Sequence, residues 1–343
     1  MKKIFSPVFF FLLLSCNNNH VPQIVLTPLE SGIHATIRAI DAVNDSVVWA
    51  SGAGGHVLKS GDCGENWEVF RIDTAGKMDF RSLYAWGADS AMVFSTDNPA
   101  VAYKTSDGGK TWRMVFKREQ KGIFINSMSF KDAGNGVAVG DPVEGKFLLL
   151  GTTDGGETWN DLAAPVAGAG EGGFAASNSC VQYLPSGKIV FITGVAGANF
   201  YSAPGKDRGW KVAEPGIRSG GEDGCDGIYC VYMKDDKTGM VAGGNYKQEK
   251  IKEGVVAFTA DGGATWHLPQ TPPHGFISCV RPVPGYEKMW IAVGSHGYSV
   301  SYDDGRNWVP GSEEGYHALT APEKGKYMYA AGERGKMARI EVQ

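Results

Sequence analysis

The stretch Lys104-Thr105-Ser106-Asp107-Gly108-Gly109-Lys110-Thr111-Trp112 recurs along the chain and decides its fold. Close copies are GTTDGGETW at 151–159 and FTADGGATW at 258–266, and looser copies are SGDCGENW at 60–67 and SYDDGRNW at 301–308. A sixth segment, SAPGKDRGW at 202–210, keeps the Ser and the Trp but is one residue longer and lacks the aligned Asp. The shared pattern is Ser/Thr-x-Asp-x-Gly-x-Thr/Asn-Trp.

This pattern is typical of a tight turn between two β-strands. Asp-Gly and Gly-Gly supply the positive φ angles that such turns need. The Asp carboxylate and the Ser/Thr hydroxyl are placed to accept hydrogen bonds from the turn amides. The Trp begins the next strand, and we expect its ring to pack under the turn. The five aspartates, Asp62, Asp107, Asp154, Asp261 and Asp303, are therefore predicted to be structural.

Turns that return every 45 residues or so, each within a set of short strands, predict the blades of a β-propeller. No long helical period interrupts them, so the predicted class is all-β. Six expected repeats span 36–70, 79–117, 122–163, 173–213, 226–269 and 275–310. The last segment, 316–342, supplies three strands, and the β-prone run 24–29 near the N-terminus supplies the missing fourth. This closure predicts seven blades; six is the alternative if a terminal segment packs differently.

The 343 residues fit one large β domain, which we expect at 23–343 as a monomer. The net charge is −4, and no run of Lys and Arg is present, so binding to nucleic acid has no electrostatic support.

The N-terminus has the features of an export signal. Lys2 and Lys3 precede an apolar run at 4–14, which is too short to remain as a membrane-spanning helix. Leu13-Leu14-Ser15-Cys16 resembles the bacterial lipobox, which implies removal of residues 1–15 and lipidation of Cys16. A lipidated tether at 16–22 would then anchor the protein in the bacterial cell envelope, with the outer membrane favoured. An ordinary secretory signal with a coincidental Cys is the alternative.

Five cysteines remain after such cleavage, and an odd number argues against a complete disulfide framework. Cys180, Cys230 and Cys279 each precede a Val in matching segments, so we expect buried core positions. Equivalent positions on neighbouring blades are too far apart to share an ion, so no metal site is predicted. A local bridge between Cys225 and Cys230 stays open.

The turn pattern resembles the Asp-box, or BNR repeat, of sialidases and related propellers. Together with GVAVG at 136–140 in a second strand, it is similar to the photosystem II stability/assembly factor-like branch of these propellers, over most of residues 36–310. The resemblance implies assembly or binding and does not imply a reaction. It also implies that the Asp-box turns lie away from the functional site.

In a propeller, the loops that join blades, and those that join second to third strands, surround one mouth of the central channel. We expect ligands there, because loops from different blades converge. The predicted ligand contacts on this face are Arg38, Arg81, Asp141, Glu171, His56 and His296. Arg38 and Arg81 suit an anionic ligand, because guanidinium groups bind carboxylates in a bidentate way.

The sequence leaves open whether the protein is an enzyme, and binding is favoured over catalysis. Sialidase chemistry needs three clamping arginines, and only Arg38 and Arg81 are clear. A more general glycoside hydrolase needs two carboxylates, for which Asp141, Glu171 and Glu222 are available. No nucleotide, haem, quinone or copper motif appears, so no cofactor is predicted.

The function predicted from the sequence is an exported, lipid-anchored propeller that binds an envelope protein or a glycan on its channel face. A glycoside hydrolase with paired carboxylates on that face is the alternative.

Overall fold

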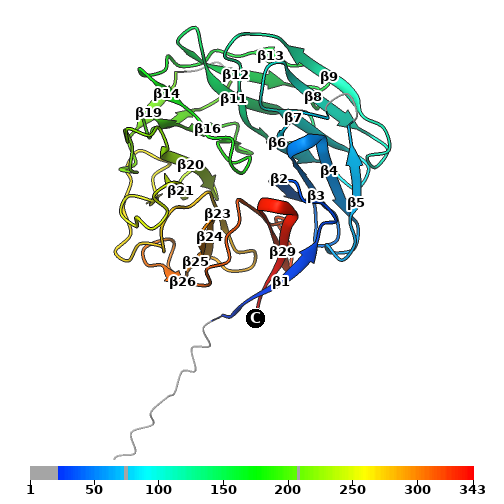
Figure 1. Ribbon diagram of the computed structural model, residues 1–343. Helices are drawn as coiled ribbons and strands as arrows, with labels where there is room; N and C mark the ends of the chain where they lie inside the picture. Colours follow the sequence, from blue (N-terminus) through cyan, green and yellow to red (C-terminus); the bar gives the residue numbers. More distant parts are fainter. Residues whose placement is uncertain (1–21, 73–75, 207–208) are drawn as a thin grey trace, which may run out of the picture.

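The computed structural model describes residues 22–72, 76–206 and 209–343. In these residues, seven antiparallel sheets surround a central axis like the blades of a propeller (Figure 1). Each blade begins with the strand nearest the axis, and the inner strands of neighbouring blades contact one another around the ring. The prediction of an all-β, seven-bladed propeller is therefore confirmed, and six blades are excluded.

The first three blades each have four strands in chain order. Blade one is β2 (Ile37–Ala42), β3 (Val48–Gly52), β4 (His56–Ser60) and β5 (Glu68–Arg71). Blade two is β6 (Phe80–Ala85), β7 (Ala91–Ser95), β8 (Ala100–Thr105) and β9 (Arg113–Arg118). Blade three is β10 (Ile125–Phe130), β11 (Gly136–Val143), β12 (Lys146–Thr152) and β13 (Asn160–Asp161).

The later blades vary more. Blade four is β15 (Val181–Tyr183), β16 (Ile189–Ile192), β18 (Phe200–Ala203) and β19 (Lys211–Ala213). Blade five is β20 (Asp226–Met233), β21 (Gly239–Asn245) and β22 (Val256–Thr259), extended at its inner edge by β17 (Gly194–Val195) and β14 (Glu171–Gly172). Blade six is β23 (Cys279–Pro282), β24 (Trp290–Gly294), β25 (Gly297–Ser301) and β26 (Val309–Pro310). Short 3-10 turns, η1 (Ala53–Gly55) and η3 (Glu333–Gly335), follow the second strands of blades one and seven.

Blade seven joins the two ends of the described chain. It consists of β27 (Ala318–Thr320), β28 (Tyr327–Ala331), β29 (Lys336–Val342) and β1 (Ile24–Glu30). β1 is antiparallel to β29, and the register runs from Ile24 opposite Val342 to Glu30 opposite Lys336. The predicted N-terminal closing strand is thus confirmed. The closure hydrogen-bonds both terminal segments into one sheet.

The Asp-box turns of blades one, two, three, five and six are held by the same set of hydrogen bonds. In the second box, Asp107 Oδ1 accepts from Thr105 Oγ1 at 2.9 Å and from the backbone amide of Thr111 at 2.9 Å. Asp107 Oδ2 accepts from Thr111 Oγ1 at 2.6 Å. The hydrogen bonds from Thr111 lower the pKa of the Asp107 carboxyl to about 2. The boxes at Asp62, Asp154, Asp261 and Asp303 repeat this arrangement.

The glycine three residues before the Trp of each box also packs against the preceding blade. At Gly263, φ is +88°, and a Cβ would lie 2.3 Å from Phe200 in blade four. The equivalent pairs are Gly64 with Leu29, Gly109 with Phe70, Gly156 with Met92 and Gly305 with Met240. The repeated glycine therefore serves two needs, a left-handed backbone and close contact between blades.

Candidate functional site

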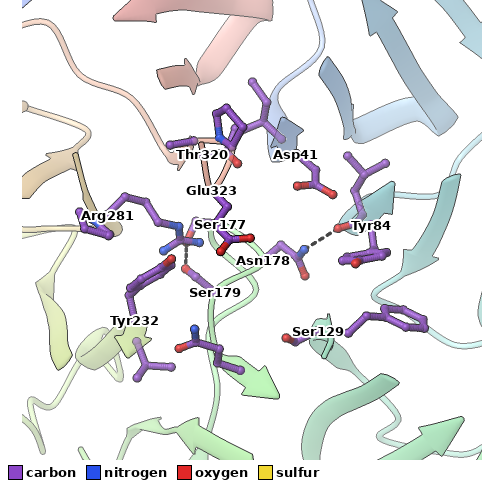
Figure 2. A pocket seen from close by; sticks show the side chains of 18 of the residues that line it. Asp41, Tyr84, Ser129, Ser177, Asn178, Ser179, Tyr232, Arg281, Thr320 and Glu323 are labelled. Carbon is purple, nitrogen blue, oxygen red and sulfur yellow. Dashed lines mark hydrogen bonds between the residues drawn. The ribbon is translucent and has the colours of Figure 1, made fainter. Parts of the chain in front are cut away.

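A segment of blade four crosses the centre of the ring and divides the channel. The inner strand β15 begins only at Val181, and residues 173–179, here called the plug segment, run through the axis before it (Figures 1 and 2). Asn178 Nδ2 donates to the carbonyl of Leu83 in blade two at 2.8 Å, and Asn178 Oδ1 accepts from the Met128 amide in blade three at 3.0 Å. Ser177 Oγ donates to the carbonyl of Ser278, before β23 of blade six, at 2.8 Å. The plug segment is thus tied to both sides of the ring.

The plug segment separates two cavities. The connector-face chamber opens among the loops that join blades; it has a volume of about 420 Å³, and Phe174, Ala175 and Ala176 form part of its wall. The Asp-box-face chamber opens at the other end, has a volume of about 460 Å³, and is bounded by Ser177 and Asn178. The first of these lies on the face where the sequence predicts ligand binding.

Two arginines line the connector-face chamber from adjacent inner strands. Arg81, in β6, forms an ion pair with Asp79 at 2.7 Å and donates to the carbonyl of Ala175 in the plug segment at 3.4 Å. Arg38, in β2, is half-buried and has no hydrogen bond or ion pair to any described residue. Burial and the charge of Arg81 both lower the pKa of the Arg38 guanidinium. A desolvated cation beside a second cation would be stabilised by an anion placed between them.

His317 lies beside the two arginines, and its Nε2 makes no hydrogen bond. Burial and the charges of Arg38 and Arg81 lower the pKa of His317 to about 3. The imidazole is therefore neutral at neutral pH, and its approach to the Glu333 carboxylate, at 3.5 Å, is not an ion pair. The low pKa therefore reflects the burial of the imidazole first and the positive charge of the two arginines second.

The wall facing blades four, five and six is aromatic. Phe174 of the plug segment stacks on Tyr229 of β20 with ring centroids 3.9 Å apart and an interplanar angle of 4°. Tyr229 meets Phe276 edge-on at 4.8 Å, and Tyr246 lies near the same ring. The Tyr229 hydroxyl donates to the carbonyl of Cys225. The chamber thus places two arginines opposite an apolar wall, with Glu249 and Glu333 also in its lining. The arginines and the rings suit a ligand that carries a carboxylate next to a ring or aliphatic chain.

Asp141 and Glu171 lie beside the plug segment and do not line the connector-face chamber. Asp141 Oδ1 accepts from Asn126 Nδ2 at 2.9 Å and from the Gly173 amide at 2.8 Å, and burial raises the pKa of its carboxyl. Asp141 therefore holds the start of the plug segment in place.

Glu171, a predicted ligand contact, is not free to meet a ligand. It is buried in β14, where its carboxylate accepts hydrogen bonds from Thr193 Oγ1, Asn199 Nδ2, the Tyr201 hydroxyl and the Gly168 amide. Both oxygens are occupied by these internal donors. The sequence could not indicate this network, because most of the donors lie 22–30 residues further along the chain.

The remaining predicted contacts are spread around the connector face and do not line its chamber. His56 Nδ1 is hydrogen-bonded to the carbonyl of Ala53 at 2.8 Å. His296 Nδ1 lies 3.9 Å from Glu249, which does line the chamber. Glu222, predicted only as an alternative catalytic acid, is exposed in the loop before β20. Of the predicted contacts, the structure brings only Arg38 and Arg81 together in one cavity.

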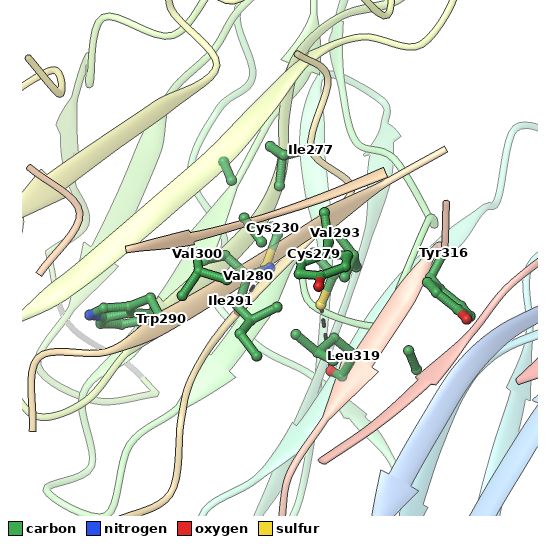
Figure 3. Close-up of a cluster of buried hydrophobic side chains, with 14 of the residues drawn as sticks. Cys230, Ile277, Cys279, Val280, Trp290, Ile291, Val293, Val300, Tyr316 and Leu319 are labelled. Atoms are coloured by element: carbon green, nitrogen blue, oxygen red, sulfur yellow. Dashed lines mark hydrogen bonds between the residues drawn. The ribbon is translucent and has the colours of Figure 1, made fainter. Parts of the chain in front are cut away.

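The cysteines of the described residues are all free thiols, and no bridge joins Cys225 to Cys230. Cys180, Cys230 and Cys279 are fully buried, and Figure 3 shows Cys230 and Cys279 within an apolar cluster between blades five, six and seven. Across residues 22–72, 76–206 and 209–343, no three His, Cys, Asp or Glu side chains are arranged to hold a metal ion. No helix in that part of the chain is long and apolar enough to cross a membrane.

No protein-family model matches the chain. The chain is similar to the photosystem II assembly lipoprotein Ycf48 of Synechococcus sp. (strain CC9902), with 24% identity over 218 residues. That match covers 64% of this chain and 57% of the relative, so the chain matches little more than half of that protein's length.

Two solved structures of Ycf48 have the same fold. One, described as Ycf48 bound to D1 peptide, has a TM-score of 0.68 at 14% identity and covers 93% of this chain and 97% of its own. Ycf48 from Cyanidioschyzon merolae has a TM-score of 0.64 at 16% identity, covering 92% and 98%. The WD40 repeats of RRP9 reach 0.67 at 10% identity, covering 93% and 97%, so the shape alone does not specify a role. The resemblance to photosystem II assembly proteins is confirmed.

Proposed function

We propose that this protein is a binding module that holds a carboxylate-bearing, partly apolar segment of a partner protein in the connector-face chamber. The observation that carries the proposal is Arg38, a half-buried guanidinium without a partner in the chain, next to Arg81 and opposite the Phe174–Tyr229 stack. A partner carboxylate would bridge the two guanidinium groups and relieve their repulsion. An adjacent apolar side chain would cover the rings.

A protein partner is favoured by the similarity to Ycf48. That relative is described as an assembly lipoprotein, and one Ycf48 structure is described as bound to a peptide. The partner of the present chain is an envelope protein in this proposal, identified by its acidic and apolar segment.

Hydrolysis of a glycan has weaker support from the geometry. The alternative acids are Asp141, Glu171 and Glu222, and none of them lines the connector-face chamber. Glu171 is occupied by internal donors, and Glu222 is exposed in its loop. A glycoside hydrolase needs two carboxylates flanking one bound sugar. Binding of a glycan without hydrolysis would use the aromatic wall and is an outcome of the experiment below.

Membrane attachment through Cys16 belongs to the same proposal, although residues 1–21 lie outside the described part of the chain. Its support is the Leu13-Leu14-Ser15-Cys16 sequence and the description of the Synechococcus relative as a lipoprotein. Labelled palmitate should be incorporated in cells by the natural chain and not by a Cys16→Ser variant. Equal labelling of both would overturn the anchor and leave the binding site unaffected.

The binding proposal is tested by photo-crosslinking in cells. A photoreactive residue at Ser295, which lines the connector-face chamber, should give adducts with a protein, and Arg38→Gln in the same chain should abolish them. The matched control is the same residue at Lys110, which is exposed in an Asp-box turn. Adducts that form equally from Lys110, persist with Arg38→Gln or contain only glycan would contradict the proposal.

A further inference from the structure

The Asp-box-face chamber is a second cavity that the function proposed above does not use. It is lined by the ends of the inner strands and the loops that follow them in all seven blades, and the plug segment closes its floor (Figure 2). Its volume of about 460 Å³ is within the range of small-molecule sites, which is roughly 300–1,000 Å³. Three charged side chains line it, Arg281, Asp41 and Glu323, and Glu323 is exposed to solvent. The fold leaves two of them, Arg281 and Asp41, partly buried or buried and incompletely paired.

The first group is Arg281, near the end of β23. Its Nη1 donates to the carbonyl of Val280 at 2.8 Å and to Cys230 Sγ at 3.4 Å, and its guanidinium lies over the ring of Tyr232 at 5.1 Å. Its Nε and Nη2 have no hydrogen-bond partner among the described residues, and no carboxylate forms an ion pair with it there. The guanidinium therefore has free donors directed at a cavity.

The second group is Asp41, in β2 on the opposite side of the chamber (Figure 2). Asp41 Oδ2 accepts from the Ala85 amide at 2.8 Å, and Oδ1 has no donor among the described residues. Burial raises the pKa of the Asp41 carboxyl to about 6, while the Ala85 amide and the charge of Arg281 oppose the shift. Asp41 is thus ionised at neutral pH. Burial makes its negative charge unfavourable, and a cation beside Oδ1 would offset this desolvation.

Asp41 and Arg281 face the same space without forming an ion pair. A lone anion at Arg281 would meet the field of the Asp41 carboxylate, and a lone cation at Asp41 would meet that of Arg281. A molecule with both charges satisfies both groups at once. The rings of Tyr84 and Tyr232 lie next to these groups and can contact the carbon atoms between the two charges.

We propose that the Asp-box-face chamber binds a small zwitterion of the amino-acid class, with its carboxylate at Arg281 and its ammonium group at Asp41. This site is separate from the peptide site, because the plug segment lies between the two chambers. The separation of the two protein charges selects the length of the ligand.

Titration calorimetry with the full chain at pH 7.5 tests the proposal. The zwitterionic probes are glycine, γ-aminobutyrate and glycylglycine, which differ in the distance between their charges, and the singly charged probes are acetate and methylammonium. At least one zwitterion should bind tenfold or more tightly than either singly charged probe. Zwitterions that bind no better than acetate, or show no binding, would overturn the proposal.

Two variants test whether the zwitterion binds at Asp41 and Arg281. Asp41→Asn keeps an acceptor for the Ala85 amide, so the fold is retained while affinity for the best zwitterion should fall at least tenfold. Arg281→Lys should have a similar effect, and circular dichroism would check its folding because Arg281 contacts Cys230. The matched control is Asp89→Asn, which removes an exposed carboxylate from the loop after β6, outside the chamber, and should leave affinity unchanged. Full affinity in Asp41→Asn would refute the assignment.

Discussion

The Asp-box turns and the channel that the plug segment divides differ in how fully their polar side chains are hydrogen-bonded. Every Asp-box turn satisfies its own carboxylate, as Asp107 does through Thr105 and Thr111. The channel instead leaves polar and charged groups without a full set of partners, as at the Arg38 guanidinium, the neutral His317 imidazole and the Asp41 carboxylate. We therefore expect the repeated residues to hold the ring together and the residues that depart from the repeat to bind ligands. The predictions below test this division.

The largest expected effect comes from the second glycine of an Asp-box. Gly263→Ala places a Cβ at φ +88° and 2.3 Å from Phe200, so the free energy of unfolding should fall by about 3–5 kcal/mol. Urea denaturation measures the change. Gly205→Ala is the matched control, because that glycine lies in the degenerate turn with no atom within 4 Å of the new Cβ. Equal effects at the two positions would show that the close contact between blades is unimportant.

His317 makes stability depend on pH. Its pKa is about 3 in the folded protein and near 6.5 in the unfolded chain, so the unfolded chain binds more protons between these values. Stability should therefore fall as the pH decreases from 6.5, by roughly 3 kcal/mol at pH 4 from this group alone. Denaturation of the natural chain and of His317→Gln across this range isolates the contribution. The same pH dependence in both proteins would mean that His317 is not held neutral.

The plug segment should depend on Asn178. Asn178→Ala removes the bonds to Leu83 and Met128 and leaves a positive-φ alanine, so we expect a loss of roughly 2–3 kcal/mol. Asn178→Asp retains the acceptor for Met128 and should lose less. Thermal unfolding compares the two variants. If Asn178→Ala unfolded at the temperature of the natural chain, the plug segment would not be held by this side chain.

The smallest effect on stability is expected at the site itself. Arg38→Gln removes a desolvated cation that repels Arg81 and has no partner in the described chain, so stability should change by less than about 1 kcal/mol, or rise. A loss as large as that of Gly263→Ala would show that Arg38 has a structural role and would weaken its assignment to binding.

The ring could be predicted from sequence because its elements repeat. The turn pattern and the spare run at 24–29 indicate seven blades and their closure, and both are confirmed by β1 pairing with β29. The inner-strand positions of Arg38 and Arg81 also follow from aligning the repeats. These inferences need only the repeated sequence pattern and the requirement that the blades close into a ring.

The plug segment and the aromatic wall could not be predicted in the same way. Residues 173–179 occupy the place of a regular inner strand in the aligned repeats, and their path through the axis depends on contacts such as Asn178 with Leu83, 95 positions away. The glycines at 168, 170, 172 and 173 are a local signal for an irregular backbone before Phe174, but they do not indicate its path. The internal hydrogen bonds of Glu171 could not be predicted for the same reason, because its donors come from distant parts of the chain.

The central claim, that the connector-face chamber binds a carboxylate next to an apolar group, is tested most directly with N-acetyl-phenylalanine and its amide. The pair differs only in charge, and the acetyl group removes the ammonium that the Asp-box-face chamber would need. Chemical-shift titration should show the acid binding at least tenfold more tightly than the amide, with the difference lost in Arg38→Gln. Equal binding of acid and amide by the natural chain, or an unchanged preference in Arg38→Gln, would contradict the claim.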